Sequence, residues 1–307
     1  MFSQTLSDQP LLTEKEINKL LLSAATVSSD SENAALIARK SGEILSPDTG
    51  AGTDFAEVRA YHSGDDPRHI DWRATARTGK PLLRTFHNER SQPLCILIDR
   101  TDTMRYGTQV RLKVTQALRL ALWISGREAR KNRDISFVIL DKPSHWLPEQ
   151  QGINSIKQML KQANLPCPPL NYDATSQQQS TVNWNQILSG IKQHILPGSE
   201  LVLISDFNSL NKNHGKLMCT LGQYCLCHSI HIFDPSETEV NFPAAIELHW
   251  HKIVCKLSVY HQQTASKLNA VINTRMDTIM HMFSKAQINF MSLSVTQQDL
   301  SSVGRRV

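Results

Sequence analysis

The stretch Pro93-Leu94-Cys95-Ile96-Leu97-Ile98-Asp99-Arg100-Thr101-Asp102-Thr103-Met104 decides the fold expected for this chain. Its apolar run is too short for an independent helix and follows a proline, so it predicts a buried β-strand. The strand ends in the carboxylate of Asp99, and the hydroxyls of Thr101 and Thr103 follow. Ligands of α/β proteins bind just beyond the carboxyl ends of central parallel strands. Oxygen donors at that place suit a hard divalent cation such as Mg²⁺.

Further apolar runs alternate with segments of helical periodicity, which predicts an α/β fold built on a doubly wound, mostly parallel sheet. Asp206 directly follows one of these runs, so a second carboxylate is expected at a strand end. The predicted strands are residues 94–98, 135–140, 201–206, 225–233 and 288–295. The predicted helices are residues 108–131, 182–195 and 264–284, and residues 239–260 are β-rich.

Three segments are expected along the chain. Residues 1–45 form an N-terminal helical segment, with a capping box at Thr13 and Glu16 and a second helix from Ser31 to about Gly42. Residues 46–92 form an Arg/Asp-rich segment, and residues 93–307 form the α/β domain with a small β insertion at about 236–262.

Composition describes an ordinary globular protein, because 40% of the 307 residues are hydrophobic and 20% are charged. No apolar run reaches the roughly 18 to 20 residues of a membrane helix, and no secretory signal pattern is visible, so we expect a cytoplasmic protein without a membrane span. The six cysteines lack a framework spacing and are expected to be reduced thiols. A zinc cluster around Cys225 and Cys227 is the weaker alternative, since no Cys-x2-Cys pair exists.

The net charge of +5 comes largely from residues 105–133, which hold eight bases against one acid, Glu128. Such a stretch is typical of the solvated side of a helix, here near Arg119, and could also meet an acidic protein partner. It lacks the interleaved aromatic residues of a base-stacking surface, so no nucleic-acid partner is expected.

The segment from Thr53 to Arg90 is dense in charge but nearly neutral, with seven Lys/Arg against six acids. This balance favours a lattice of bidentate Arg–carboxylate ion pairs. The alternative is a hydrolytic metal site held by Asp65, Asp66 and Asp71.

The spacing of this segment, together with the Asp-x-Thr-x-Thr-Met that follows the strand, resembles the bacterial family known as domain of unknown function fifty-eight. Many spacings agree at once, over residues from about Leu36 to the C-terminus. The residues of the signature are Asp54, Arg59, Tyr61, Gly64, Asp65, Asp66, Arg68, Asp71, Trp72, Arg73 and Arg77. Members of this family look like von Willebrand factor A domains preceded by the signature.

The resemblance implies a metal-ion-dependent adhesion site, in which three loops hold the ion. Asp99, Thr101 and Thr103 match the first loop, with threonine in place of serine, and Asp206 matches the third. Thr181 is our choice for the second-loop hydroxyl, although Ser180 and Thr175 lie in the same loop. The resemblance further implies a non-enzymatic adaptor or chaperone-like partner of a MoxR-type AAA+ ATPase. A simpler alternative is that Asp99 and Thr101 only satisfy amides at the strand end.

An enzymatic alternative rests on Asp99-Arg100-Thr101-Asp102-Thr103, which is similar to the Asp-Lys-Thr-Gly-Thr of haloacid-dehalogenase-like phosphotransferases. Asp99 would then be the phosphorylated nucleophile. Against it, Asp102 replaces the glycine, and no later Gly-Asp-x-x-x-Asp is present. A nucleophile elbow and a nucleotide-binding Gly-x4-Gly-Lys-Ser/Thr loop are absent as well. We therefore expect a binding protein.

Overall fold

The structure is a computed structural model that describes residues 9–26, 49–50, 54–62, 66–87, 92–167, 183–238, 246–250, 253–257 and 262–307. The chain forms two compact units, which are considered separately. The first unit comprises Met1–Asp30 and Gln92–Val307, and the second comprises Ser31–Ser91.

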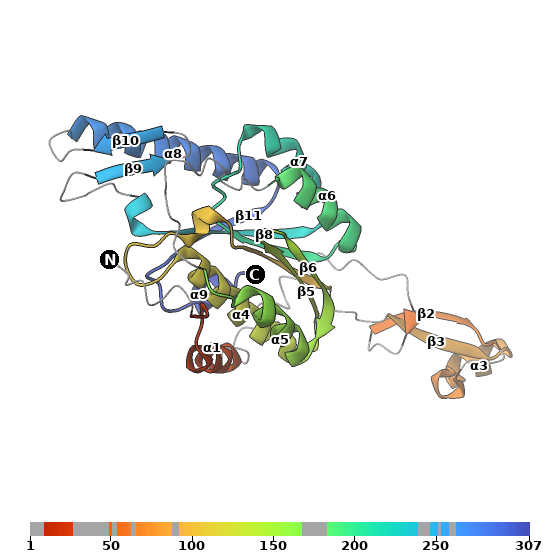
Figure 1. Cartoon of the computed structure of the whole chain (residues 1–307). Coiled ribbons are helices and arrows are strands. Elements are labelled where there is room, and N and C mark those ends of the chain that lie inside the picture. Colours follow the sequence, from red (N-terminus) through yellow and green to blue (C-terminus); the bar gives the residue numbers. More distant parts are fainter. Residues whose placement is uncertain are drawn as a thin grey trace. The chain divides into compact units, whose positions relative to one another are not determined.

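A six-stranded sheet forms the centre of the first unit, in the order β11-β8-β7-β4-β5-β6 (Figure 1). Its strands are β4 (Leu94–Asp99), β5 (Asp134–Leu140), β6 (His145–Gln151), β7 (Glu200–Ser205), β8 (Leu226–Phe233) and β11 (Asn289–Ser294). All neighbouring strands are parallel except β6, which pairs antiparallel with β5 at the edge. This arrangement confirms the predicted α/β fold with a mostly parallel sheet.

Both faces of the sheet are covered by helices, because the central strands are apolar on both sides. Ile96 and Ile98 of β4 point to one core, whereas Cys95 and Leu97 point to the other. The first core contains α1 (Glu14–Thr26), α4 (Lys113–Arg130), α5 (Gly152–Ala163) and α9 (Ser301–Gly304). The second contains α6 (Trp184–His194), α7 (Gly215–Tyr224) and α8 (Gln262–Lys285).

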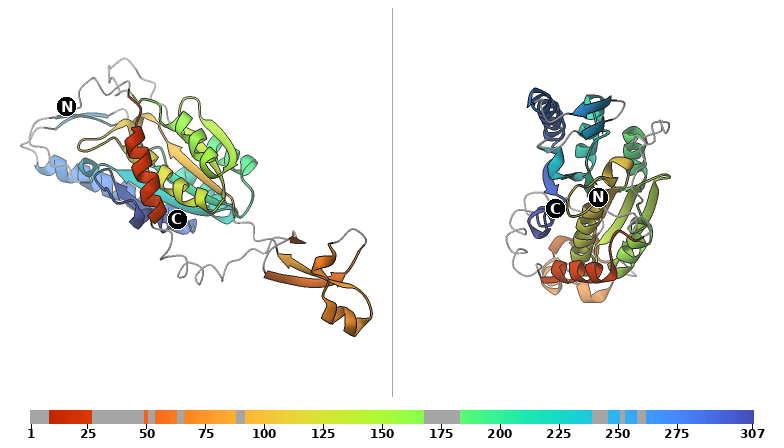
Figure 2. Two further views of the ribbon diagram at one scale, coloured as in Figure 1. Left: turned by 90° about the horizontal axis from the view of Figure 1, so that it is seen from below. Right: turned by 60° about the vertical axis from the view of Figure 1, so that its left-hand side comes forward.

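The N-terminal helix α1 packs on α4 and is part of the first unit (Figure 2). Gly126 of α4 gives it room, since an added Cβ would lie 2.8 Å from Cδ2 of Leu21. Just before α1, the amide of Leu12 donates to Oδ1 of Asn164 at 2.7 Å, and Nδ2 of Asn164 donates to the Leu12 carbonyl at 3.0 Å. The sequence-based division had instead set residues 1–45 apart. The predicted helix from Ser31 to Gly42 lies outside the described residues.

Four α-helices and strands of the first unit were not expected from the sequence, namely β6, α5, α7 and α9. Strand β6 is polar and contains Pro148, as edge strands often do. The predicted β-rich excursion contains an antiparallel pair, β9 (Ile246–Trp250) and β10 (Ile253–Leu257). None of the helices in the described ranges has the length and apolarity needed to cross a membrane.

The second unit holds a small antiparallel sheet in the order β1-β3-β2, and in the chain it lies between the two parts of the first unit. Its strands are β1 (Thr49–Gly50), β2 (Asp54–Ala60) and β3 (Leu82–His87). Between β2 and β3 lie the short 3-10 helix η2 (Pro67–His69) and the helix α3 (Trp72–Thr78).

Candidate metal centre

Asp99 is the last residue of β4, and both of its carboxylate oxygens are hydrogen-bonded. Oδ1 accepts from the Thr101 amide at 2.9 Å and from the Thr101 hydroxyl at 2.6 Å. Oδ2 accepts from the hydroxyl of Ser205, which ends the neighbouring strand β7, at 2.5 Å. Burial, and then the charge of Asp206, raise the pKa of Asp99 to about 6, against the hydrogen bonds from Ser205 and Thr101. The geometry thus favours a carboxyl group that is costly to ionise.

Asp206 follows β7, and its environment lowers its pKa, whereas that of Asp99 is raised. Burial acts to raise the pKa of Asp206, but the Lys113 ammonium and the hydrogen bonds that the carboxylate accepts together hold the pKa below its ordinary value. Oδ2 accepts from Nζ of Lys113 at 2.9 Å, and Oδ1 accepts from the amide of Asn208 at 2.9 Å. The side chain of Thr103 also lowers the pKa through a hydrogen bond. Adjacent strand ends therefore bring Asp99, Thr101, Thr103 and Asp206 together.

Lys113, the first residue of α4, was not expected in this site. Its side chain is 2% exposed, and Nζ also lies 2.6 Å from Oε1 of Glu237 and 5.7 Å from the ring centroid of Tyr106. Burial acts to lower the pKa of Lys113, but Asp206 and Glu237 together raise it above its ordinary value. The ammonium is therefore a fixed positive charge beside the third-loop carboxylate.

The loop after β8 supplies Glu237, the second carboxylate beside Lys113. A reciprocal capping box in η5 (Pro235–Glu237) fixes this loop. Asp234 accepts from the Ser236 amide at 3.0 Å, and the Asp234 amide donates to Glu237 at 2.9 Å. Asp234 also accepts from the amide and hydroxyl of Thr108, at 2.8 and 2.5 Å. The Asp-x-x-Glu spacing at 234–237 was the available sequence signal for this cap. The loop thus ties β8 to the segment that carries Thr101 and Thr103.

The donor set at these strand ends fits a hard divalent cation. Because the Thr101 hydroxyl gives its proton to Asp99, its lone pairs are left for another partner, and the residue is half-buried rather than sealed. Two carboxylates and two hydroxyls are the oxygen ligands that Mg²⁺ accepts. Thr181, the predicted second-loop donor, lies outside the described residues, as do Ser180 and Thr175.

Within the described ranges, no group of three or more His, Cys, Asp and Glu side chains is placed to hold a metal ion. The candidate centre therefore depends on hydroxyls beside its two carboxylates. The same finding gives no support to the zinc alternative, and Cys225 and Cys227 are buried free thiols.

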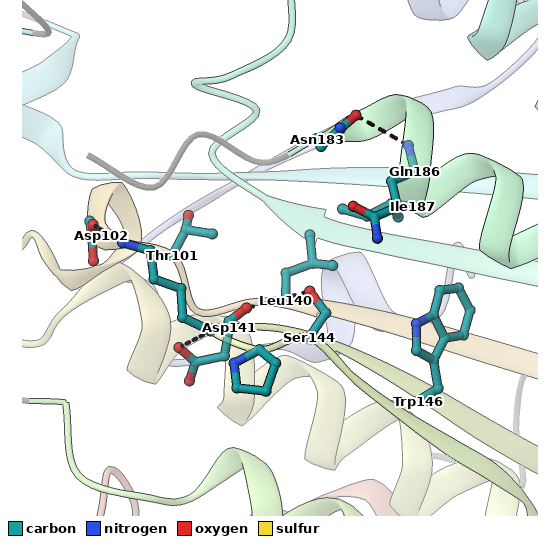
Figure 3. A pocket seen from close by; sticks show the side chains of 11 residues that line it. Thr101, Asp102, Leu140, Asp141, Ser144, Trp146, Asn183, Gln186 and Ile187 are labelled. Atoms are coloured by element: carbon teal, nitrogen blue, oxygen red, sulfur yellow. Dashed lines mark hydrogen bonds and ion pairs between the residues drawn. The ribbon is translucent and has the colours of Figure 1, made fainter. Parts of the chain in front are cut away.

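A cavity of about 420 Å³ opens beside Thr101 at the carboxyl end of β4. Figure 3 shows Thr101 and Asp102 on one side of it, with Trp146 and Ile187 across from them. Leu140 and Asp141, at the end of β5, also contribute to its lining. The hydroxyl of the candidate centre thus adjoins a space with both apolar and charged walls.

One charge-based prediction needs correction. Arg119 is 6% exposed and donates to Oε1 of Gln116 at 2.8 Å, so this part of the basic stretch is inside the domain rather than on a solvated helix face. In the second unit, Asp66 and Asp71 serve as helix caps, accepting from the amides of Arg68 and Ala74 at 2.9 and 3.0 Å. Gly64 and Asp65 are outside the described residues, as are the side chains of Asp54 and Arg59.

Comparisons with known proteins relate the chain to uncharacterised bacterial sequences and to solved α/β domains. Uncharacterized proteins of Mycobacterium tuberculosis and Mycobacterium bovis are 34% identical over 67 residues, which are 22% of this chain and 21% of theirs. BatB from Bacteroides thetaiotaomicron aligns with a TM-score of 0.44 at 10% identity, over 70% of this chain and 96% of that one. The VWA domain of SpRpn10 aligns with a TM-score of 0.40 at 12% identity, over 70% and 95%.

A family model matches much more of the sequence than the mycobacterial alignments do. Its match runs over residues 57–265, and so includes part of the signature segment together with β4, β7 and β8. The matched region is more than half of the chain, which therefore belongs to the family described as "Protein of unknown function DUF58".

Proposed function

We propose that this chain is a non-enzymatic protein-interaction module that binds partners through a divalent cation held by Asp99, Thr101, Thr103 and Asp206. The observation that carries this proposal is the 2.6 Å hydrogen bond from the Thr101 hydroxyl to Asp99. It turns the hydroxyl proton inward, so the oxygen lone pairs of a half-buried residue are available to an ion. Mg²⁺ is the ion that best suits these donors.

Low negative charge at the centre supports a binding role. Lys113 neutralises Asp206, so Asp99 supplies most of the uncompensated charge around the donor oxygens. When bound, the ion would supply a positive charge and an open coordination position for a carboxylate oxygen of a partner protein. The cavity beside Thr101 offers space for the side chain that carries such a carboxylate.

The sequence around Asp99 favours this role over phosphoryl transfer. The phosphotransferase motif that it resembles has a glycine where this chain has Asp102, and no later Gly-Asp-x-x-x-Asp is present. Incubation with Mg²⁺ and acetyl phosphate, followed by intact-protein mass spectrometry, tests the alternative: a phosphoryl adduct lost in Asp99→Asn would establish it.

The family resemblance suggests the partner, a cytoplasmic MoxR-type AAA+ ATPase that this chain would serve as an adaptor or chaperone-like component. The test is biolayer interferometry with the purified ATPase of the same organism, with Mg²⁺ or with EDTA. We expect binding of the wild-type chain to require Mg²⁺, and binding by Asp99→Ala to be lost.

Asp277→Ala is the matched control, because it removes an exposed carboxylate of α8 that is not one of the proposed ligands. It should bind as the wild type does. Equal binding by Asp99→Ala, with or without EDTA, would discard the metal bridge while leaving the adaptor role standing. No binding by the wild-type chain would discard the partnership.

A further inference from the structure

The candidate metal centre leaves the Arg/Asp-rich signature of the second unit unexplained. Its acids Asp66 and Asp71 cap η2 and α3, and Gly79 ends α3 in the left-handed conformation at φ 73°. The Gly79 amide donates to the Thr75 carbonyl at 2.9 Å. These residues therefore fix both ends of a short helix.

Helix α3 has an inner and an outer face. The hydroxyl of Thr75 accepts from the amide of Leu82 on β3 at 3.0 Å, and Ala74 beside it is half-buried. At 100° per residue, positions 72, 73, 76 and 77 share the opposite side of the helix. All four of these residues are exposed. The outer face therefore consists of Trp72, Arg73, Ala76 and Arg77 (α3 is seen beside the β2–β3 hairpin in Figure 2).

Trp72 is the unusual member of this face, because its side chain is 70% exposed. Tryptophan is highly buried on average, since it carries more apolar area than other residues. None of the residues of α3 is buried, so Trp72 contributes little to the packing of its own unit. Exposed tryptophan beside arginine is the composition of binding hot spots between proteins.

The charge of this surface is positive. Arg68, Arg73, Arg77 and Lys80 are all exposed, and α3 contains no acid. No ion pair between residues of the described ranges involves any of these four cations. The guanidinium groups are therefore available to carboxylates of another molecule.

We propose that Trp72, Arg73 and Arg77 form a docking surface for an acidic patch on a partner protein. This proposal rests on the proposed function, and the partner is the ATPase named there. Trp72 would be buried at the centre of the contact, and the two arginines would pair with acids around it. None of these three residues belongs to the candidate metal centre, so variants can test the two contacts separately.

A protein partner fits this surface better than other polyanions. A single aromatic side chain cannot stack a run of bases, as single-strand binding requires. A helix of 7 residues is too short for the long apolar face of an interfacial membrane helix. A tryptophan flanked by arginines, in contrast, can bind a folded protein surface that offers a single pocket lined by acidic residues.

The experiment measures binding of the full-length chain to the purified ATPase in Mg²⁺, with the variants Trp72→Ala and Arg77→Glu. Each should weaken binding by about thirty-fold or more, the effect of losing a hot-spot side chain. The controls are Leu22→Ala, an equally exposed apolar residue at 69%, and Lys161→Glu, which makes the same charge change on α5. Both controls should leave the affinity unchanged, and circular dichroism checks that all four variants fold.

Placing a photo-crosslinking phenylalanine derivative at position 72 then identifies the contacted peptide of the ATPase. We expect an acidic peptide, in which an acid-to-lysine change restores binding of Arg77→Glu. Wild-type affinity in both Trp72→Ala and Arg77→Glu would overturn the docking surface while the ATPase partnership survives. Failure of the wild-type chain to bind would overturn both. Tryptophan-dependent binding to single-stranded oligonucleotides or anionic vesicles, without an effect on the ATPase, would assign the surface to another ligand.

Discussion

The ammonium of Lys113 lies 2.9 Å from Oδ2 of Asp206, and this contact makes the two strand-end carboxylates unlike each other. Asp206 is held ionised by a buried cation, whereas the pKa of Asp99 is raised to about 6 by burial and by the charge of Asp206. One carboxylate is thereby satisfied within the protein, and the other gains most from an added cation.

We predict that Lys113→Met increases the affinity of the candidate centre for a divalent cation by about tenfold, because a positive charge beside Asp206 is removed. Mn²⁺ titration followed by electron paramagnetic resonance measures this directly. The metal-free variant should also be less stable by about 3–5 kcal/mol, since Asp206 and Glu237 lose their buried partner.

The control for that variant is Lys142→Met, which removes a 57% exposed lysine that lies 3.6 Å from Asp102. It should change neither the Mn²⁺ affinity nor the stability appreciably. An unchanged Mn²⁺ affinity in Lys113→Met would show that the ammonium does not compete with the ion.

Opposite effects on stability are expected for the two carboxylates. A pKa raised from 3.8 to about 6 means that the folded state binds the proton more tightly, so the contribution of Asp99 to stability is lost as the pH rises through 6. In EDTA at pH 8, Asp99→Asn should therefore stabilise the chain, by at most about 3 kcal/mol. Asp206→Asn should destabilise it by about 3–5 kcal/mol, because Lys113 loses a buried partner.

Urea unfolding curves of both variants provide the measurement. The gain in Asp99→Asn should shrink at pH 5, where the wild-type carboxyl group is largely protonated. A loss of stability in Asp99→Asn at pH 8 would contradict the raised pKa.

His231 gives the fold a sensitivity to acid. Burial, first of all, lowers the pKa of His231 to about 4, and its ring stacks with that of Phe233 at 5.8 Å between centroids. In the unfolded chain His231 takes up a proton near pH 6.5, whereas in the folded chain it stays neutral until about pH 4. Stability is therefore lost as the pH falls from 6.5 toward 4. This loss should amount to roughly 3 kcal/mol.

The substitution His231→Phe should therefore reduce the drop in melting temperature between pH 7.5 and pH 4.5. Because Asp99 acts in the opposite sense over an overlapping range, the difference between variant and wild type is the quantity to compare. An identical drop in both proteins would show that His231 does not remain neutral.

Two glycines of α7 should respond differently to alanine. A Cβ at Gly222 would lie 1.9 Å from the carbonyl oxygen of Ala286, which is backbone and cannot turn away. We expect Gly222→Ala to cost about 1–3 kcal/mol or more in the free energy of unfolding. At Gly215 the nearest atom is 3.9 Å away and φ is −57°, so Gly215→Ala should be neutral or slightly stabilising. Thermal unfolding separates the two, and equal stability would contradict the close approach.

Much of the fold could be predicted because strands buried on both faces appear in the sequence as unbroken apolar runs. The rule that parallel strands end at one edge then placed Asp99 beside Asp206. Strand β6 escaped prediction because an edge strand needs no apolar run and tolerates Pro148. The role of Lys113 was not predicted because its partners are 93 and 124 residues away in the sequence. Only the folded chain shows that this member of a basic stretch is buried.

The attachment of α1 has a consequence for the covalent chain. The reciprocal hydrogen bonds between Leu12 and Asn164, together with the packing of Leu21 against Gly126, attach the N-terminal helix to the rest of the first unit. The second unit is therefore an insertion anchored at both of its ends, rather than an appended tail. A single proteolytic cut between α1 and β1 would leave two fragments that stay associated and co-migrate under native conditions.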